Sequence, residues 1–185
     1  MSTLGPRACY DEGKRVGETY CYIFQDYFGV HTNIIRPFNV YGPGMQRTDY
    51  RVMPNFAAQI AADKPLMIYG DGRQTRTFCY VADAMIGFMR VLLKGVPGET
   101  YNIGNPNPEV SMNELADAFE RVSPVPVRTK ITEYPDTYPA DEPMRRCPDI
   151  RKAELQLGFE PKIGLDAGVK RFLTWAIPRY QSELG

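Results

Sequence analysis

Residues 77–103 read TFCYVADAMIGFMRVLLKGVPGETYNI, and this stretch decides the fold class. It begins with a run typical of a strand at Thr77–Val81 and continues with a helical segment at Ala82–Lys94. A second strand is expected at Thr100–Ile103. Because a strand, a helix and another strand follow one another, the sequence predicts an α/β chain.

Large apolar side chains recur at helical spacing within the segment Ala82–Lys94. They are Met85, Phe88, Met89 and Leu92. An amphipathic helix buries its apolar face, so we expect these four side chains to point into the core.

The same alternation of elements continues on both sides of this stretch. Toward the N-terminus we expect a helix at Arg7–Phe28 ended by Gly29, a strand at His31–Arg36, a loop over Pro37–Arg51, a helix at Val52–Ala62 and a strand at Leu66–Tyr69. Toward the C-terminus we expect a capping box at Ser111–Glu114 that opens a helix to Val122, a proline-rich loop over Tyr134–Pro148, a helix capped by Asp149 that reaches Leu157, and a last helix at Leu165–Tyr180. Pro178 favours an early end of that last helix.

Composition and charge exclude several classes of protein. With 185 residues, of which 43% are hydrophobic, the chain has the length and the apolar content of one ordinary domain. Lys and Arg number 22 and so do Asp and Glu, so no basic excess favours nucleic acid. Apolar runs are too short to span a membrane, and no leader pattern is visible. We therefore expect a soluble, cytoplasmic protein without nucleic-acid or membrane partners.

The sequence offers few of the residues that a metal site or a hydrolase needs. The four cysteines are widely and irregularly spaced, and His31 is the single histidine. Closed zinc sites need clustered Cys and His ligands, and a Ser-His-Asp or Cys-His hydrolase would have to rest on His31 alone. We expect no metal site.

A complete nucleotide-phosphate motif is also missing. The two candidate glycine turns, Gly42–Gly44 and Gly70–Gly72, lack the third glycine of a dinucleotide fingerprint. Gly13 and Lys14 are followed by arginine, where a phosphate-binding loop needs Ser or Thr. The sequence therefore lacks the turn that meets a pyrophosphate.

Tyr10 and Lys14 are the pair of residues that point to chemistry. They lie four residues apart in the first expected helix, so their side chains share a face and can reach one ligand. A nearby ammonium favours the phenolate, which suits a tyrosine that acts as a base. Spacing alone is a weak signal, because an exposed tyrosine beside a solvated lysine gives the same pattern.

The residues around this pair carry a family resemblance. GPRACYDEGKRVGET at 5–19 resembles the active-site helix of the extended short-chain dehydrogenase/reductases, specifically the UDP-glucuronate decarboxylases (UDP-xylose synthases), a group of lyases. Further matching segments are RPFNVYGP at 36–43, IYGDGRQTRTFCYV at 68–81, YNIGN at 101–105, PDIRKA at 148–153 and LGFEP at 157–161. The first and third segments are specific, whereas epimerases and dehydratases share the Asn39 and Gly104 motifs.

The resemblance implies which part of the family fold this chain represents. It matches the C-terminal part of a Rossmann-like α/β fold, without the first Gly-rich βαβ half and with a small substrate-binding lobe. Residues 1–50 would hold the active-site helix and the following strand of the Rossmann-like core. Residues 51–185 would form mainly the nucleotide-sugar lobe.

The resemblance also implies roles for individual residues. Tyr10 would be the catalytic base, and Lys14 would hold the nicotinamide ribose of NAD. The other cofactor contacts implied are Pro37, Phe38 and Val40. The implied substrate contacts are Asn39, Arg51, Arg76, Arg145 and Arg146, with Ile68 and Tyr69 lining a uracil pocket. For Arg76 an interdomain ion pair stays open, and Arg145 and Arg146 can equally be solvated surface charges.

The family chemistry implied is the NAD-dependent conversion of UDP-glucuronate to UDP-xylose and CO2 through a 4-keto intermediate. Alternatives left open are a fragment of a nucleotide-sugar 4,6-dehydratase or 4-epimerase, or a non-catalytic nucleotide-sugar-binding or dimerisation module. Whether the 185 residues act alone is also open, because the Gly-rich NAD motif is missing. A homodimer through the Tyr10–Lys14 helix is expected from the resemblance.

Overall fold

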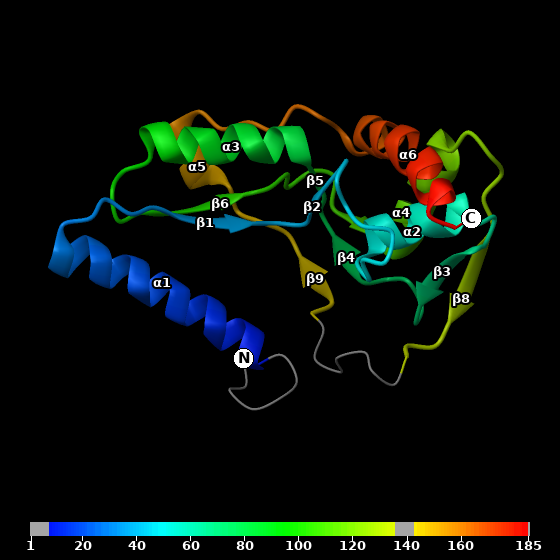
Figure 1. The fold of residues 1–185 in the computed structure, drawn as a ribbon, viewed down its shortest axis with the longest axis horizontal. Helices are drawn as coiled ribbons and strands as arrows, with labels where there is room; N and C mark the ends of the chain where they lie inside the picture. Colours follow the sequence, from blue (N-terminus) through cyan, green and yellow to red (C-terminus); the bar gives the residue numbers. More distant parts are fainter. Residues whose placement is uncertain (1–7, 136–142, 185) are drawn as a thin grey trace.

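The computed structural model describes residues 8–135 and 143–184, and their elements alternate along the chain as an α/β protein requires (Figure 1). The helices are α1 (Ala8–Phe28), α2 (Val52–Ala61), α3 (Val81–Lys94), α4 (Met112–Val122), α5 (Arg151–Leu157) and α6 (Leu165–Ser182). The strands are β1 (Ile34–Pro37), β2 (Val40–Tyr41), β3 (Leu66–Tyr69), β4 (Thr75–Arg76), β5 (Cys79–Tyr80), β6 (Thr100–Ile103), β7 (Val110–Ser111), β8 (Thr129–Thr132) and β9 (Arg145–Arg146). The expected helix start at Arg7 and the middle of the proline-rich loop lie outside the described residues.

Strands β1 and β6 form a parallel pair that organises the first part of the molecule. Ile34 pairs with Thr100 and Pro37 with Ile103. In Figure 1, α1 lies below this pair, while α3 and α5 lie above it. Tyr101 and Ile103 of β6 belong to a hydrophobic cluster with Leu157 of α5.

A second and larger hydrophobic core lies between α2, α4 and α6. Tyr41 lies inside it and makes edge-to-face contacts with Phe78, Tyr80 and Phe172, at centroid distances of 6.3, 5.7 and 6.1 Å. Strands β3 and β8 pair in parallel at its rim, and β4 lies between β7 and β9 in a three-stranded sheet. Both cores contain residues beyond 51. The expected division into residues 1–50 and 51–185 stays a prediction.

The face of α3 that we expected to be buried is largely exposed. Met85, Met89 and Leu92 are 49%, 48% and 73% exposed, and Phe88 is only partly buried. The buried residues of α3 are Asp83, Ala84, Gly87 and Val91.

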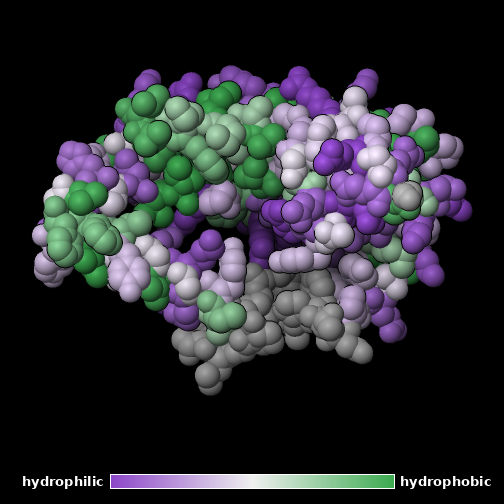
Figure 2. Space-filling model, viewed as in Figure 1, coloured by the Kyte–Doolittle hydropathy of each residue, from purple (hydrophilic) through white to green (hydrophobic). Residues whose placement is uncertain are grey.

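The cause of this reversal is the close approach of α3 to the β1–β6 pair. A Cβ atom added at Gly87 would lie 2.6 Å from Cγ2 of Ile103. Only small side chains fit on that face, so the larger apolar residues are left on the outer side. Figure 2 shows an apolar area over α3.

Smaller differences concern element boundaries. The expected loop Pro37–Arg51 contains β2, which pairs with β5 at the end of the Thr77–Val81 run. Helix α6 continues through Pro178 to Ser182, and Ala176 and Tyr180 on either side of the proline are buried. The N-cap of α5 is Ile150, while the Asp149 carboxylate accepts a hydrogen bond from the Arg151 N–H, 3.0 Å away.

None of the described helices combines the length and apolar character needed to cross a lipid bilayer.

Candidate active site

Tyr10 and Lys14 lie one turn apart near the start of α1. The Lys14 ammonium is 5.4 Å from the centroid of the Tyr10 ring. Both side chains are exposed, Tyr10 to 61%. The helical spacing therefore places the phenol and the ammonium together, where both can reach one ligand.

Helix α1 is joined to β1 by a forked ion pair. Arg36 of β1 donates from Nε to Oε1 of Glu18 over 2.7 Å and from Nη2 to Oε2. These hydrogen bonds lower the pKa of Glu18. Thr32 adds two bonds, from its N–H to Oε1 of Gln25 at 3.0 Å and from its hydroxyl to the Cys21 carbonyl at 2.9 Å. Since no residue of α1 is fully buried, these polar contacts hold the Tyr10–Lys14 pair in place.

The segment that follows β1 turns sharply beside β5. Asn39 has a φ of 42°, a conformation that a short polar side chain tolerates. Its side-chain nitrogen donates to the Thr77 carbonyl at 2.8 Å, and its own carbonyl accepts from the Cys79 N–H at 3.2 Å. The amide expected to face a nucleotide sugar thus ties the β1–β2 link to the neighbourhood of Arg76.

Gly42 is needed at the end of this segment. Its φ of 151° lies in the region that glycine favours. A Cβ atom there would also come within 2.5 Å of Cγ1 of Val81. This close packing lets the loop from Gly42 to Gln46 bend over the N-terminal end of α3.

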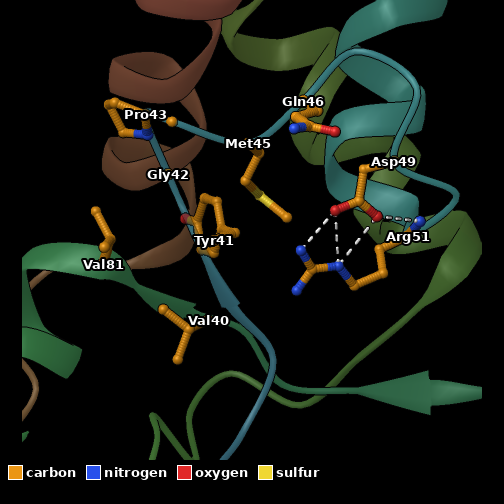
Figure 3. Close-up of a pocket in the computed structure, with 10 residues that line it drawn as sticks. Val40, Tyr41, Gly42, Pro43, Met45, Gln46, Asp49, Arg51 and Val81 are labelled. Carbon is orange, nitrogen blue, oxygen red and sulfur yellow. Dashed lines mark hydrogen bonds and ion pairs between the residues drawn. The ribbon is translucent and has the colours of Figure 1, made fainter.

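That loop lines a cavity of about 370 Å³, shown in Figure 3. Val40 and Arg51 line it, together with Asp49. The Asp49 carboxylate accepts from Nε of Arg51 and from its backbone N–H, at 3.0 and 2.9 Å. These bonds raise the pKa of Arg51, and Tyr10 adds a smaller electrostatic contribution in the same direction. The first turn of α1 therefore lies within electrostatic range of Arg51.

The other predicted arginines lie in the three-stranded sheet. Arg76 is 8% exposed and donates from Nη1 to the carbonyls of Thr75 and Met144, at 2.8 and 3.2 Å. Arg146 is its partner in strand register. Arg145 is exposed and donates hydrogen bonds to the Glu109 carboxylate from Nε and Nη2, with Nη2 2.7 Å from Oε2. Arg145 is thus held by a carboxylate, neither freely solvated nor directed into the cavity.

The two residues expected to line a uracil pocket face different environments. Ile68 is 4% exposed and belongs to the larger hydrophobic core, so its side chain does not line an open surface. Tyr69 follows it on the opposite face of β3 and stacks on Tyr134, with ring centroids 5.9 Å apart. Of the two, Tyr69 is the one whose side chain lies outside the larger core.

Pro37 and Phe38 differ in exposure at the end of β1. Pro37 is exposed, whereas Phe38 is partly buried and donates its N–H to the Ile103 carbonyl at 2.9 Å. Across residues 8–135 and 143–184, no three His, Cys, Asp or Glu side chains gather as metal ligands.

Sequence reasoning missed the carboxylates that hold the arginines. Asp49 precedes Arg51 by two residues, so a local Asp-x-Arg pattern offered a signal. Glu18 and Glu109 are 18 and 36 residues from their partners, and no local pattern marks them.

Comparison with known proteins identifies the family of this chain. A family model described as "NAD dependent epimerase/dehydratase family" matches residues 1–104, more than half of the chain. The chain belongs to this family. Solved members share its fold. The Bacillus cereus UDP-glucuronic acid 4-epimerase, in complex with UDP-glucuronic acid and NAD, has a TM-score of 0.79 and 30% identity over 90% of this chain. The epimerase Mth375 of Methanothermobacter thermautotrophicus has a TM-score of 0.82 and 29% identity over 91% of this chain.

Curated members of the epimerase/dehydratase family give higher identities. UDP-glucuronic acid decarboxylase 1 of Arabidopsis thaliana is 42% identical over 174 residues, which cover 94% of this chain and 39% of that protein. UDP-glucuronic acid decarboxylase 1 of Danio rerio is 40% identical over 95% of this chain and 40% of its own length. The chain also covers 52% of the Bacillus cereus epimerase and 50% of Mth375. It therefore spans about half of these solved members and two-fifths of the two curated ones.

Proposed function

We propose that this chain provides the catalytic helix and the sugar-nucleotide side of a UDP-glucuronate decarboxylase. The observation that carries the proposal is the exposed Tyr10–Lys14 pair on α1, in which the ammonium is 5.4 Å from the centroid of the Tyr10 ring. The identity of about two-fifths to proteins named UDP-glucuronic acid decarboxylases supports the same substrate.

In the proposed reaction Tyr10 acts on the 4-hydroxyl of the sugar. Acting as the general base, it would accept the hydroxyl proton as the C4 hydride is transferred to NAD⁺. The resulting C4 carbonyl lies β to the C6 carboxylate, so the C5–C6 bond breaks and its electron pair passes to the C4 oxygen as CO2 departs. The Tyr10 hydroxyl stabilises that oxygen by donating a hydrogen bond. Protonation at C5 and return of the hydride to C4 complete UDP-xylose.

The residues of this chain fit one end of the cofactor. NAD⁺ when bound supplies hydride acceptance and return. The exposed hydroxyl of Tyr10 and ammonium of Lys14 are suitable donors for a ribose, and Pro37, Phe38 and Val40 would lie beside the nicotinamide. The sequence has no Gly-rich turn for the pyrophosphate, so the contacts that this chain offers are to the nicotinamide end of the cofactor.

A 4-epimerase acting on the same sugar nucleotide is the second candidate. The Bacillus cereus UDP-glucuronic acid 4-epimerase shares the fold at 30% identity. The 42% identity to a decarboxylase favours loss of the carboxylate. An epimerase would keep the carboxylate, so product mass separates the two.

Helix α1 would also form a homodimer with a second copy of the chain. Val16, Tyr20, Phe24 and Tyr27 share one side of α1 and are 49%, 58%, 48% and 75% exposed. Apolar side chains in such a row are typical of a helix that packs against another protein surface. Sedimentation analysis tests this, because Tyr20→Glu is expected to shift the chain toward monomer.

Mass spectrometry of the sugar nucleotide tests the proposed function. The chain is incubated with UDP-glucuronate and NAD⁺, and the expected product has lost CO2. Tyr10→Phe removes the proton acceptor and is expected to lower the rate by about 10²–10⁴-fold. Tyr22→Phe is the matched control, since Tyr22 is exposed to 62% on the same helix but not beside Lys14. A product of unchanged mass with inverted configuration at C4 would contradict the proposed decarboxylation. An equal loss of rate in Tyr10→Phe and Tyr22→Phe would contradict the proposed role of Tyr10.

A further inference from the structure

The Asp49–Arg51 pair in the cavity has an arrangement that the proposed reaction does not yet use. Both residues line the cavity. We infer that Asp49 is a positioning residue, which holds Arg51 so that the outer edge of its guanidinium binds the paired anionic oxygens of the sugar nucleotide. This inference rests on the proposed function and adds a residue to its binding site.

The hydrogen bonds divide the guanidinium into a held edge and an open edge. Oδ2 of Asp49 accepts from Nε and Nη2 of Arg51 at 3.0 and 2.5 Å, while Oδ1 accepts from Nε and the backbone N–H. Nη1 donates to no residue that the structure describes. In Figure 3 the Nη1 side of the guanidinium points away from Asp49. Arg51 therefore keeps free N–H donors while its orientation is fixed.

Burial distinguishes Asp49 from an ordinary surface partner. The side chain of Asp49 is 17% exposed, whereas that of Arg51 is 58% exposed. A partly buried carboxylate with three hydrogen-bonded N–H groups has little freedom to turn. The arginine can therefore meet a ligand without first losing its own side-chain freedom, and that preorganisation strengthens binding.

The chain contains a second Asp-x-Arg pair with the same bonds but a different setting. Arg151 donates to Asp149 from its backbone N–H, from Nε and from Nη2, at 3.0, 3.0 and 2.5 Å. The side chain of Asp149 is 55% exposed, and neither residue lines the cavity of Figure 3. Asp149 is therefore a control matched in local geometry and different in location.

The open edge of Arg51 fits one class of ligand group. A planar guanidinium with parallel N–H donors binds two oxygens of a carboxylate or a phosphate side by side. UDP-glucuronate offers both groups, the diphosphate and the sugar carboxylate. Their shared chemistry is a pair of anionic oxygens, and a comparison of ligands can separate them.

Calorimetric titration of the whole chain with UDP and with UDP-glucuronate tests the inference. Arg51→Met is expected to weaken binding by about 10–100-fold, the range for a charge-assisted hydrogen bond. Asp49→Asn is expected to weaken it by about 5–10-fold, because the amide cannot hold both donors of Arg51. In the Arg51→Met background, Asp49→Asn is expected to have no further effect, as a pair that acts as one unit requires. Asp149→Asn is expected to bind as the wild type does.

The ligands identify the group that is bound. If Asp49→Asn weakens the binding of both ligands, Arg51 binds the diphosphate. If it weakens the binding of UDP-glucuronate alone, Arg51 binds the carboxylate. Either result supports the inference. The inference is overturned if Asp49→Asn binds the ligands as tightly as the wild type or more tightly. It is also overturned if Asp49→Asn weakens binding equally in the wild-type and Arg51→Met backgrounds. No measurable binding of either ligand by the wild type also overturns it. Loss of CO2 is measured separately, so the proposed decarboxylation and this inference can fail independently.

Discussion

Asp83 is a buried carboxylate that joins α3 to the segment before α6. It is 3% exposed, and its Oδ2 accepts the backbone N–H groups of Lys162 and Ile163 at 3.0 and 2.8 Å. A buried charge costs free energy unless hydrogen bonds satisfy it. Asp83 therefore anchors the loop that leads into the larger core.

Replacing this carboxylate tests its contribution. Asp83→Ala leaves two backbone N–H groups without their acceptor, and we expect the free energy of unfolding to fall by about 1–3 kcal/mol. Urea unfolding followed by circular dichroism measures the loss. Asp117→Ala, at an exposed position of α4, is expected to stay within about 0.5 kcal/mol of wild type. Equal midpoints for both variants would contradict this role.

The candidate site shows which contacts a sequence can reveal. The contact between Tyr10 and Lys14 could be predicted because helical spacing places the two side chains on one face. Arg51 was named, but its partner Asp49 was not. The contact between Arg145 and Glu109 depends on how β4, β7 and β9 pair, and no local pattern encodes that pairing.

At the scale of elements, α1 depends on its polar contacts with β1 and the segment before it. Glu18 and Arg36 carry most of the charge in that contact, and their side chains are 31% and 51% exposed. Solvent screens such a pair, so its contribution is roughly 0.2–1 kcal/mol. The helix that bears Tyr10 is thus the element most easily loosened.

Acid is expected to loosen α1. The pKa of Glu18 lies below its usual value of 4.5 because Arg36 stabilises the carboxylate. The stabilisation is fully present above that usual value and is lost as the pH falls through the lowered pKa. Amide hydrogen exchange at about pH 6 and about pH 3 should show a drop in protection across α1.

Two variants check the assignment to Glu18. Glu18→Gln should remove most of the pH dependence and leave α1 weakly protected throughout. Glu12→Gln, which loses a contact with Arg15 within α1, should respond to pH as wild type does. If Glu18→Gln keeps the acid response, another group is responsible.

Elements with strong local signals were predictable, and those fixed by a distant partner were not. Strands β3 and β6 were predicted with the bounds that they have, and the Ser111 capping box is present. The two-residue strands β2, β4, β7 and β9 exist because of their tertiary partners, whereas β5 lies within the strand predicted at Thr77–Val81. The buried face of α3 was predicted wrongly because a row of large apolar residues does not say which neighbour it meets.

At the scale of the whole molecule, the outer face of α3 is an apolar surface without a neighbour among the described residues. Met85, Met89 and Leu92 of α3 follow one another at intervals of four and three residues, and each is about half exposed or more. This spacing is typical of a helix seam that packs against another helix. We expect the chain to associate through this surface as its concentration rises.

Sedimentation velocity over a range of concentrations measures that association. Leu92→Glu places a charge at a position that is 73% exposed, so it should reduce the average mass at high concentration. Its free energy of unfolding should change by no more than about 0.5 kcal/mol. Ala82→Glu, at an exposed position near the start of α3, is the control that should leave association unchanged. Undiminished association of Leu92→Glu would exclude this surface.

The β1–β6 pairing also sets an order of events during folding. Ile34 meets Thr100, so β1 cannot find its partner until the chain between them has been made. Contacts between residues so distant in sequence form late and slow the reaction. Helix α1 has no buried residue of its own and reaches its place only when β1 does. The helix that carries Tyr10 should therefore be the last part of the molecule to assemble after synthesis and the first to detach on unfolding.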